Sequence, residues 1–413
     1  MAKRSPKPRV VEPSRNQGVI RFELPEESLP PEHPVRVLDR VVGTLDLSAF
    51  TRDAKAVEGR AGRTILSPRM KLTLWLYGIS RGIGSAREIA RLTRSDDGFR
   101  WVVGDLEVSH YTLSAFRVGH EEALDQLTTD VLASLMHKGL LSLDLVAQDG
   151  TRVRASASAP SFRTHGSLLE CRRQAALHLK AVLAAADDPA EPRRRRIAQE
   201  AAARDFQRRV EEAIQTVAEI RTDRPPASGF RRASTTDADA RVMKMPDGGF
   251  RPGYNVQLAV AGSEEGGPRT IVGLRVTNLG SDMGSITPML DDVEQRTGEA
   301  PTVLLADANH AKHECVETAT RDGVEVVMAV PRRAGPLEEA SPEVMAWRAR
   351  MTTDDAKRLY RARAGLVELL NAHFKARFRI DRVLVRGLPK VRCVVLLASL
   401  TFNLLQNADR LLS

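Results

Sequence analysis

Residues 140–151 have the sequence LLSLDLVAQDGT. Apolar residues dominate the first part and the turn-forming pair Asp149-Gly150 follows, which is typical of a short buried strand that ends in an acid. The pattern recurs at residues 301–307, where PTVLLAD predicts a strand that ends in Asp307. The two stretches together predict a sheet whose buried strands end in carboxylates.

Further strand and helix signals follow the first stretch. Residues 254–262 (YNVQLAVAG) and 270–278 (TIVGLRVTN) flank a polar turn, which predicts an antiparallel hairpin. The other predicted elements are a helix around 286–293, a helix at 311–323, a strand at 324–331, a long amphipathic helix around Glu368 and an apolar terminal helix from about Pro389. This order of strands and helices predicts an α/β fold with a mixed sheet.

A charge-dense helical stretch separates the first strand from the hairpin. Residues 168–220 contain a run of four arginines, Arg193 to Arg196, among charges of alternating sign. This pattern fits an inserted helical hairpin or a coiled arm, with a solvated or a binding surface. We predict that residues 156–249 form a helical insertion that protrudes from the sheet.

The first third of the chain has helical periodicity only. Residues 1–34 are Pro-rich, charged and aperiodic, which predicts a flexible arm. Residues 35–139 are predicted to be helical, with the third of the capped helices over 110–127. Three serines stand where helix N-caps are expected: Ser67, Ser85 and Ser109. Short helices joined by Gly-containing turns fit a helix-turn-helix DNA-binding domain, and a plain helical bundle has the same pattern.

The charge distribution favours a polyanionic partner. The chain has 62 Lys and Arg against 53 Asp and Glu, a net charge of +9. Residues 356–392 contain eleven Lys or Arg against two acids, so the whole excess can be assigned to this stretch. Clustered basic residues are expected on a phosphate-binding surface, although a solvated helix has the same composition.

The cysteines and the apolar runs indicate a cytoplasmic protein. The three cysteines are isolated in sequence and offer neither a disulfide framework nor a CxxC metal site. No apolar run reaches the ~18 residues that span a bilayer, and the N-terminal residues lack an apolar signal core. We therefore expect the protein in a reducing compartment.

Three acids are the candidate catalytic residues. Sites in open α/β sheets form beyond the carboxyl ends of strands, so Asp149 and Asp307 are expected in one cleft. Like charges so close are stabilised by a shared cation, and oxygen ligands select Mg²⁺ or Mn²⁺. Either acid alone also fits a simple turn. Glu368 lies on the amphipathic helix, on the same face as Arg361 and Lys375, which are placed to hold a phosphodiester backbone.

These motifs together resemble those of the DDE transposases of bacterial insertion sequences. The matching motifs are Asp-Gly-Thr at 149–151, Ala-Asp-Ala at 306–308, and Tyr-Arg-x-Arg-x-x-x-Val-Glu at 360–368 with a lysine seven residues later. The last motif is similar to the Tyr, Arg, Glu and Lys signature of the IS-four-like branch. The similarity extends to residues 67–92, 110–117 and 253–260, and so covers most of the chain from about Pro34 onward.

The resemblance implies a transposase that binds transposon ends, cuts DNA and transfers the cut strand. It implies a ribonuclease-H-like catalytic domain of residues 140–155 and 250–413 behind a helical DNA-binding domain, residues 35–139. Two Mg²⁺ or Mn²⁺ ions would be held by three acids: Asp149, Asp307 and Glu368. The residues implied to bind DNA are Tyr360, Arg361, Arg363 and Lys375. The implied partners are double-stranded DNA, as terminal inverted repeats and target, and further copies of the chain in a dimer or larger assembly.

The chain departs from the family pattern near two of the acids. Asn309 and His310 stand where the family usually has glycine and an aromatic residue, and Leu369 stands where it commonly has proline. Arg363 lies one position farther from the third acid than in the strictest form of the signature. The alternatives are a catalytically retired transposase that only binds DNA, and a metal-dependent nuclease without strand transfer.

Three other patterns suggest different chemistry. Residues 78–82 match the GxSxG nucleophile motif, but the run before them contains polar residues that favour a helix over a buried strand. A possible zinc cluster is formed by His310, His313, Glu314 and Cys315, in an order that favours the start of a helix instead. Three further acids are predicted to lie in turns or on the surface: Asp237, Asp239 and Asp282.

Overall fold

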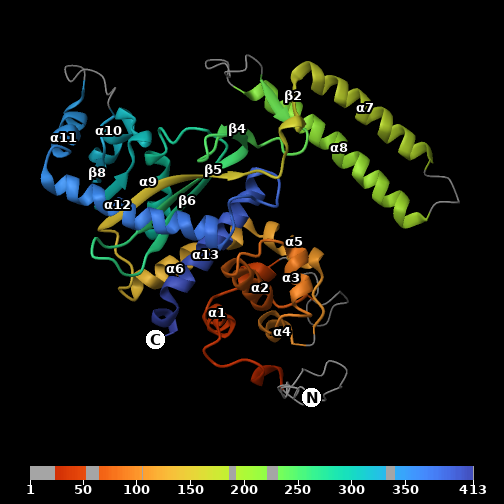
Figure 1. The fold of residues 1–413 in the computed structure, drawn as a ribbon, viewed down its shortest axis with the longest axis horizontal. Helices are drawn as coiled ribbons and strands as arrows, with labels where there is room; N and C mark the ends of the chain where they lie inside the picture. Colours follow the sequence, from red (N-terminus) through yellow and green to blue (C-terminus); the bar gives the residue numbers. More distant parts are fainter. Residues whose placement is uncertain are drawn as a thin grey trace, which may run out of the picture.

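The computed structural model describes residues 24–52, 65–104, 106–185, 192–220, 231–331 and 340–412. Most of the predicted N-terminal arm, residues 1–23, lies outside these described ranges. A six-stranded mixed sheet lies at the centre of the described part, flanked by helices on both faces (Figure 1). The predicted α/β class is therefore confirmed.

The sheet has the strand order β4-β5-β1-β7-β8, with β6 also paired to β5. Its strands are β1 (Leu145–Arg154), β4 (Arg241–Lys244), β5 (Phe250–Ala261), β6 (Thr270–Thr277), β7 (Val303–Ala306) and β8 (Glu325–Met328). β1 runs antiparallel to β5 and parallel to β7, and β7 runs parallel to β8. The predicted hairpin is present as β5 and β6. The small strands β2 (Phe162–Thr164) and β3 (Arg232–Ser234) form a separate pair.

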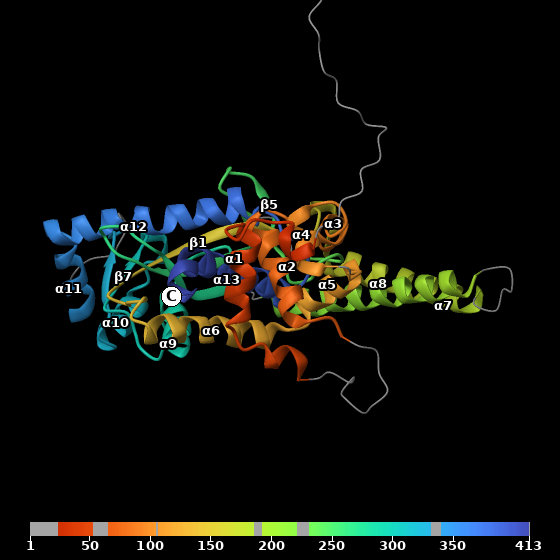
Figure 2. The same ribbon diagram turned by 90° about the horizontal axis from the view of Figure 1, so that it is seen from below.

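Alternate residues of the central strands face two different helical layers, as the two-residue period of a strand requires. Leu145 and Ala147 of β1 pack against α12 (Asp354–Ala372), whereas Val146 faces the opposite layer. That layer contains α9 (Ile286–Thr297), α10 (His313–Arg321) and α11 (Pro342–Arg350). Figure 2 shows α12 along one side of the sheet and α9 and α10 along the other. The side chains of β1 that share the phase of Leu145 therefore point toward α12.

The N-terminal block consists of helices, three of which begin at the predicted serine caps. They are α1 (Pro34–Gly43), α2 (Pro68–Ser80), α3 (Ala86–Leu92), α4 (Asp97–Val103), α5 (His110–Val118) and α6 (Glu121–His137). Ser67, Ser85 and Ser109 each accept a hydrogen bond from a backbone N–H in the first turn of α2, α3 and α5. The single helix predicted over residues 110–127 is wrong, because Gly119 caps the C-terminus of α5 and α6 begins anew.

The terminal helix α13 (Leu388–Leu412) joins this block to the sheet. It packs against α1, α2, α5 and α6 on one side and against β6 on the other. One continuous hydrophobic core therefore includes residues of α2, α13 and β5. By length and composition α13 is apolar enough to cross a membrane, although 67% of its apolar window is buried within the protein. Burial in the core accounts for that composition.

The helices α7 (His165–Ala184) and α8 (Arg193–Glu219) form an antiparallel pair that extends away from the sheet (Figures 1 and 2). A small separate cluster stabilises its base: Leu168, Ala213, Val217 and Ala233. The predicted insertion also included residues 241–244, which form β4 and pair with β5 in the sheet. This strand could not be recognised from the apolar pattern of the sequence, because it is four residues long and only Met243 within it is buried.

The remaining described elements are short. They are the 3-10 turns Pro25–Glu27, Ser48–Thr51, Ala159–Ser161 and Ala308–His310, and a π-helical turn, His373–Arg377, that continues α12.

Candidate active site

Two of the predicted acids lie side by side, Asp149 within β1 and Asp307 directly after the end of the neighbouring strand β7. In the parallel pairing of β1 with β7, Ala147 is opposite Leu305. Two residues farther along each segment, the same register places Asp149 beside Asp307. Both residues are an even number of positions from side chains that pack against α12, so both side chains point toward α12.

The predicted position of Asp149 at the end of its strand is wrong. β7 ends at Ala306, but β1 continues to Arg154 because β5 pairs with it beyond this point, with Asp149 opposite Leu258. Asp149 therefore lies inside a strand, at the place where its parallel neighbour ends. The pairing with β5 joins distant segments, with Leu258 lying 109 residues after Asp149, so local sequence does not reveal it.

Asp149 is partly buried and has no ion-pair partner among the described residues. Its Oδ1 accepts a hydrogen bond from the backbone N–H of Gly150 at 2.9 Å, and its Oδ2 accepts one from Nδ2 of Asn371 in α12, also at 2.9 Å. Burial raises the pKa of Asp149, and the charge of Asp307 adds to this effect, whereas Arg363 acts in the opposite direction. A partly buried carboxylate that forms no direct ion pair and lies beside a second carboxylate fits a site for a hard divalent cation.

Asp307 is held by the turn that follows β7. Its Oδ1 accepts hydrogen bonds from the backbone N–H of Asn309 at 3.0 Å and from Nδ1 of His310 at 2.6 Å. Its Oδ2 accepts one from Nδ2 of Asn309 at 2.8 Å. Burial acts to raise the pKa of Asp307, but the hydrogen bonds and charge of His310 and the bonds of Asn309 outweigh it, so the pKa is lowered. The two neighbouring acids thus have pKa values shifted in opposite directions.

Glu368 lies on α12, three residues before Asn371, and so on the same side of the helix as the side chain that reaches Asp149. Its side chain is exposed and forms no hydrogen bond or ion pair within the described ranges. No group of three His, Cys, Asp or Glu side chains in the described part is close enough to hold a metal ion. The fold therefore aligns two of the acids and places the third on the adjoining helix, outside a preformed cluster.

The predicted DNA-binding residues lie along α12 and the π-helical turn after it. The Arg363 guanidinium lies 5.7 Å from the ring centre of Tyr360, and its charge acts on Asp149. Arg361 is exposed, and its Nε donates to the carbonyl of Lys357 at 3.2 Å. Burial lowers the pKa of Lys375, while the charge of Asp149 raises it. Positive charge is therefore close to the aligned acids.

A buried polar network beneath the acids was missed by the sequence analysis. Asp282 begins a turn, as predicted, but its side chain is not on the surface: it is 6% exposed and accepts hydrogen bonds from Asn255 and Gln257 of β5. Its Oδ2 also pairs with Nη2 of Arg152 at 2.8 Å. The signal was present, because Asn255 and Gln257 are polar residues in the otherwise apolar stretch 254–261.

The other sequence alternatives have different outcomes. Asp237 begins a turn, as predicted, because the Ala240 N–H donates to its carbonyl, but its side chain is buried and not on the surface. The carboxylate accepts hydrogen bonds from the Tyr254 hydroxyl at 2.7 Å and the Gly387 N–H at 3.1 Å. The predicted helix at the GxSxG motif is correct, because the motif lies at the end of α2. The zinc alternative is not supported, since His310 is bonded to Asp307 while His313 is exposed.

Gly150 provides the space that this polar network occupies. A Cβ atom at this position would lie 2.6 Å from Oδ1 of Asp282 and closer still to Nε2 of Gln257. We expect Gly150→Ala to lower the free energy of unfolding by about 1–3 kcal/mol, the typical cost of overpacking. Urea unfolding of this variant and of Gly166→Ala, whose added Cβ meets nothing within 4 Å, measures the difference. Equal midpoints for both variants and the parent protein would contradict this packing.

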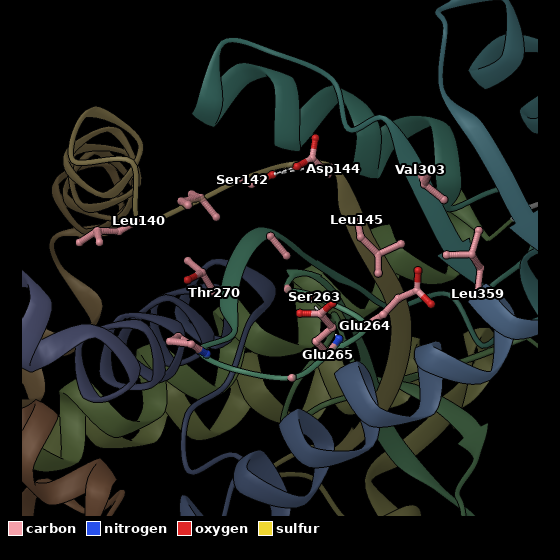
Figure 3. A pocket seen from close by; sticks show the side chains of 15 residues that line it. Leu140, Ser142, Asp144, Leu145, Ser263, Glu264, Glu265, Thr270, Val303 and Leu359 are labelled. Atoms are coloured by element: carbon pink, nitrogen blue, oxygen red, sulfur yellow. Dashed lines mark hydrogen bonds between the residues drawn. The ribbon is translucent and has the colours of Figure 1, made fainter.

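A separate pocket of about 510 Å³ lies at the other end of the same strands (Figure 3). It is lined by the start of β1 and β7, at Leu145 and Val303, and by the acids Asp144, Glu264 and Glu265. The aligned acids lie toward the opposite ends of β1 and β7, so this pocket does not belong to their site.

Two family models match the chain. Residues 230–404 match the transposase DDE domain, and residues 23–119 match the transposase domain (DUF772). The comparisons with curated proteins and with solved structures found no significant match. The first match includes Asp307 and Glu368, whereas Asp149 lies between the two matches. The two matches support a DDE transposase of insertion sequences, an enzyme that acts on DNA.

Proposed function

We propose that this chain, whose two family matches are both to transposase domains, binds the ends of an insertion sequence, cuts the DNA there and joins the cut strand to a target. We further assign it to the IS-four-like branch and to the bacterial cytoplasm, where it would act on the nucleoid. The alignment of Asp149 in β1 with Asp307 directly after the neighbouring parallel strand β7, beneath the helix that contains Glu368, is the observation that supports this function most strongly.

In this proposal the three acids hold Mg²⁺ or Mn²⁺. When bound there, such cations would supply Lewis-acid activation of water or a 3′-hydroxyl and charge stabilisation for an in-line displacement. Asn371 holds Asp149 in place, and Asn309 and His310 hold Asp307, so two of the three carboxylates are oriented in advance. Glu368 is exposed on α12 and is the acid that has to approach the pair when DNA and cation bind.

DNA is the proposed substrate and scaffold of assembly. Tyr360, Arg361, Arg363 and Lys375 would contact the phosphodiester backbone near the acids. The N-terminal helices would read the terminal inverted repeats. Because strand transfer joins two ends to one target, a dimer or larger assembly on DNA is proposed.

Arg363→Ala is expected to weaken binding to end DNA and to make it less sensitive to salt. Each phosphate that a protein cation neutralises releases counterions, so losing one contact should change the slope of log K against log salt by about 0.9. Fluorescence anisotropy over a NaCl series measures this slope. Arg321→Ala, an exposed cation at the end of α10 in the layer on the opposite face of the sheet from α12, is the control that should leave the slope unchanged. Equal slopes for the two variants would remove Arg363 from the DNA interface.

A cutting assay tests the function. The substrate is the DNA that flanks the coding sequence, incubated with the protein and Mg²⁺, Mn²⁺ or Ca²⁺. Cleavage at an inverted-repeat boundary with Mg²⁺ is the expected result. Binding of the repeats without cleavage in any metal would favour the retired transposase, and cleavage without preference for the repeats would favour the nuclease.

A further inference from the structure

His310 is fully buried and contacts Asp307 directly. Its exposed fraction is 0%, its Nδ1 lies 2.6 Å from Oδ1 of Asp307, and its Nε2 lies 3.1 Å from Oε1 of Gln257. The ring is therefore held at both nitrogen atoms. A histidine that is only part of a helix start would not need a defined partner on each side.

The partners of Gln257 determine which way its amide points. Its Nε2 lies 2.6 Å from Oδ1 of Asp282, a carboxylate that pairs with Arg152 and so acts as an acceptor. The amide N–H must therefore face Asp282, and the amide oxygen must face His310. It follows that Nε2 of His310 donates to the Gln257 oxygen. Because Oδ1 of Asp307 is also an acceptor, Nδ1 donates to it, so this arrangement of partners requires a proton on both ring nitrogens and an ion pair with Asp307.

This chain of contacts runs from an ion pair under the sheet to one of the aligned acids. Arg152 holds Asp282, Asp282 holds Gln257, and Gln257 holds the ring of His310. Asn255 and Gln148 add further hydrogen bonds to Asp282 and Gln257. Every link is a hydrogen bond or ion pair of 3.3 Å or less between buried or partly buried groups. The orientation of His310 is thus fixed independently of solvent.

We propose that His310 is a positioning residue, whose Nδ1 fixes the Asp307 carboxylate in the orientation that binds a divalent cation together with Asp149. The inference rests on the proposed function, because it takes Asp307 as a metal ligand. Mutation of a residue that hydrogen-bonds a metal ligand typically lowers metal affinity 10–100-fold. Such a hydrogen bond holds the carboxylate in its binding orientation in advance, so less conformational entropy is lost when the cation binds.

Two substitutions distinguish the role of Nδ1 from that of Nε2. The amide of asparagine in His310→Asn occupies roughly the place of Nδ1 and keeps a donor for Asp307, whereas the longer amide in His310→Gln reaches roughly the place of Nε2. We expect His310→Gln to weaken Mn²⁺ binding about 10–100-fold and His310→Asn to retain affinity within a few-fold of wild type. A purely structural role would weaken both variants equally. His313→Asn, an exposed histidine three residues away, is the matched control and should bind as wild type does.

Binding is measured on the full chain without DNA, by titrating MnCl₂ and following the electron paramagnetic resonance signal of free Mn²⁺. Thermal unfolding of each metal-free variant reports folding separately from affinity. Loss of affinity in His310→Gln with rescue in His310→Asn supports the proposal. Equal Mn²⁺ affinity in wild type and His310→Gln overturns the proposal. In that case, cleavage of repeat ends by the wild-type protein in the cutting assay would still support the transposase function. A wild-type chain that neither binds Mn²⁺ nor cuts the repeats overturns both.

Discussion

Replacing any one of the three acids by its amide is expected to reduce Mg²⁺-dependent cutting by about a thousand-fold or more. The three variants are Asp149→Asn, Asp307→Asn and Glu368→Gln. Each substitution keeps the size of the side chain and removes the charge that would bind the cation. A bound cation supplies several kcal/mol of transition-state stabilisation, and each 1.36 kcal/mol corresponds to about ten-fold in rate.

DNA binding should survive the same substitutions. Phosphate contacts to Lys and Arg supply most of the affinity for DNA, and carboxylates contribute nothing to that attraction. Gel shifts and cutting assays on the same preparations measure the two properties together. Asp355→Asn, an exposed acid in the first turn of α12, is the control that should cut as the parent does. If Glu368→Gln cut at the parental rate, Glu368 would not be a metal ligand.

Trp75→Ala is expected to destabilise the sheet as well as the N-terminal helices. Trp75 is fully buried in α2, its Nε1 donates to the Leu113 carbonyl at 3.0 Å, and the Arg117 guanidinium lies 4.7 Å from its ring centre. Truncation of a buried tryptophan typically costs about 3–5 kcal/mol. Because α2 packs on α13, and α13 packs on β6, we expect this loss to extend across the continuous core.

Hydrogen exchange measures how far the effect extends. Faster exchange of the β5 and β6 amides in Trp75→Ala would indicate that the N-terminal block and the sheet unfold as one unit. Tyr111→Ala, at a position that is 74% exposed in α5, should change stability by no more than about 0.5 kcal/mol. Unchanged exchange in β5 and β6 would instead support the separate N-terminal domain that the sequence predicts for residues 35–139.

Local patterns were sufficient to predict most of the elements. The apolar runs before Asp149 and Asp307 are β1 and β7, and Ser67, Ser85 and Ser109 are helix caps, because these features depend on a few consecutive residues. The buried face of α12 followed from helical periodicity in the same way. The division into domains stays a prediction, since the hydrophobic core is continuous across its first boundary.

Features that depend on distant segments could not be predicted. The extension of β1 past Asp149 requires β5, and the burial of Asp282 requires Arg152 and Gln257 from other strands. Asn371 became a candidate only when the fold placed its amide 2.9 Å from Asp149. The approach of Glu368 to the aligned acids also stays a prediction, because the part of the chain that the structure describes contains no preformed cluster of three ligands.

Strand joining by the wild-type protein tests the central claim most directly. The substrates are a pre-cut transposon end with a free 3′-hydroxyl and a supercoiled plasmid, incubated with the full chain and Mg²⁺. The transposase account predicts a covalent product in which the 3′ end is linked to the plasmid, absent without metal and absent with Glu368→Gln. Wild-type protein that binds the end but forms no joined product in Mg²⁺ or Mn²⁺ would contradict it.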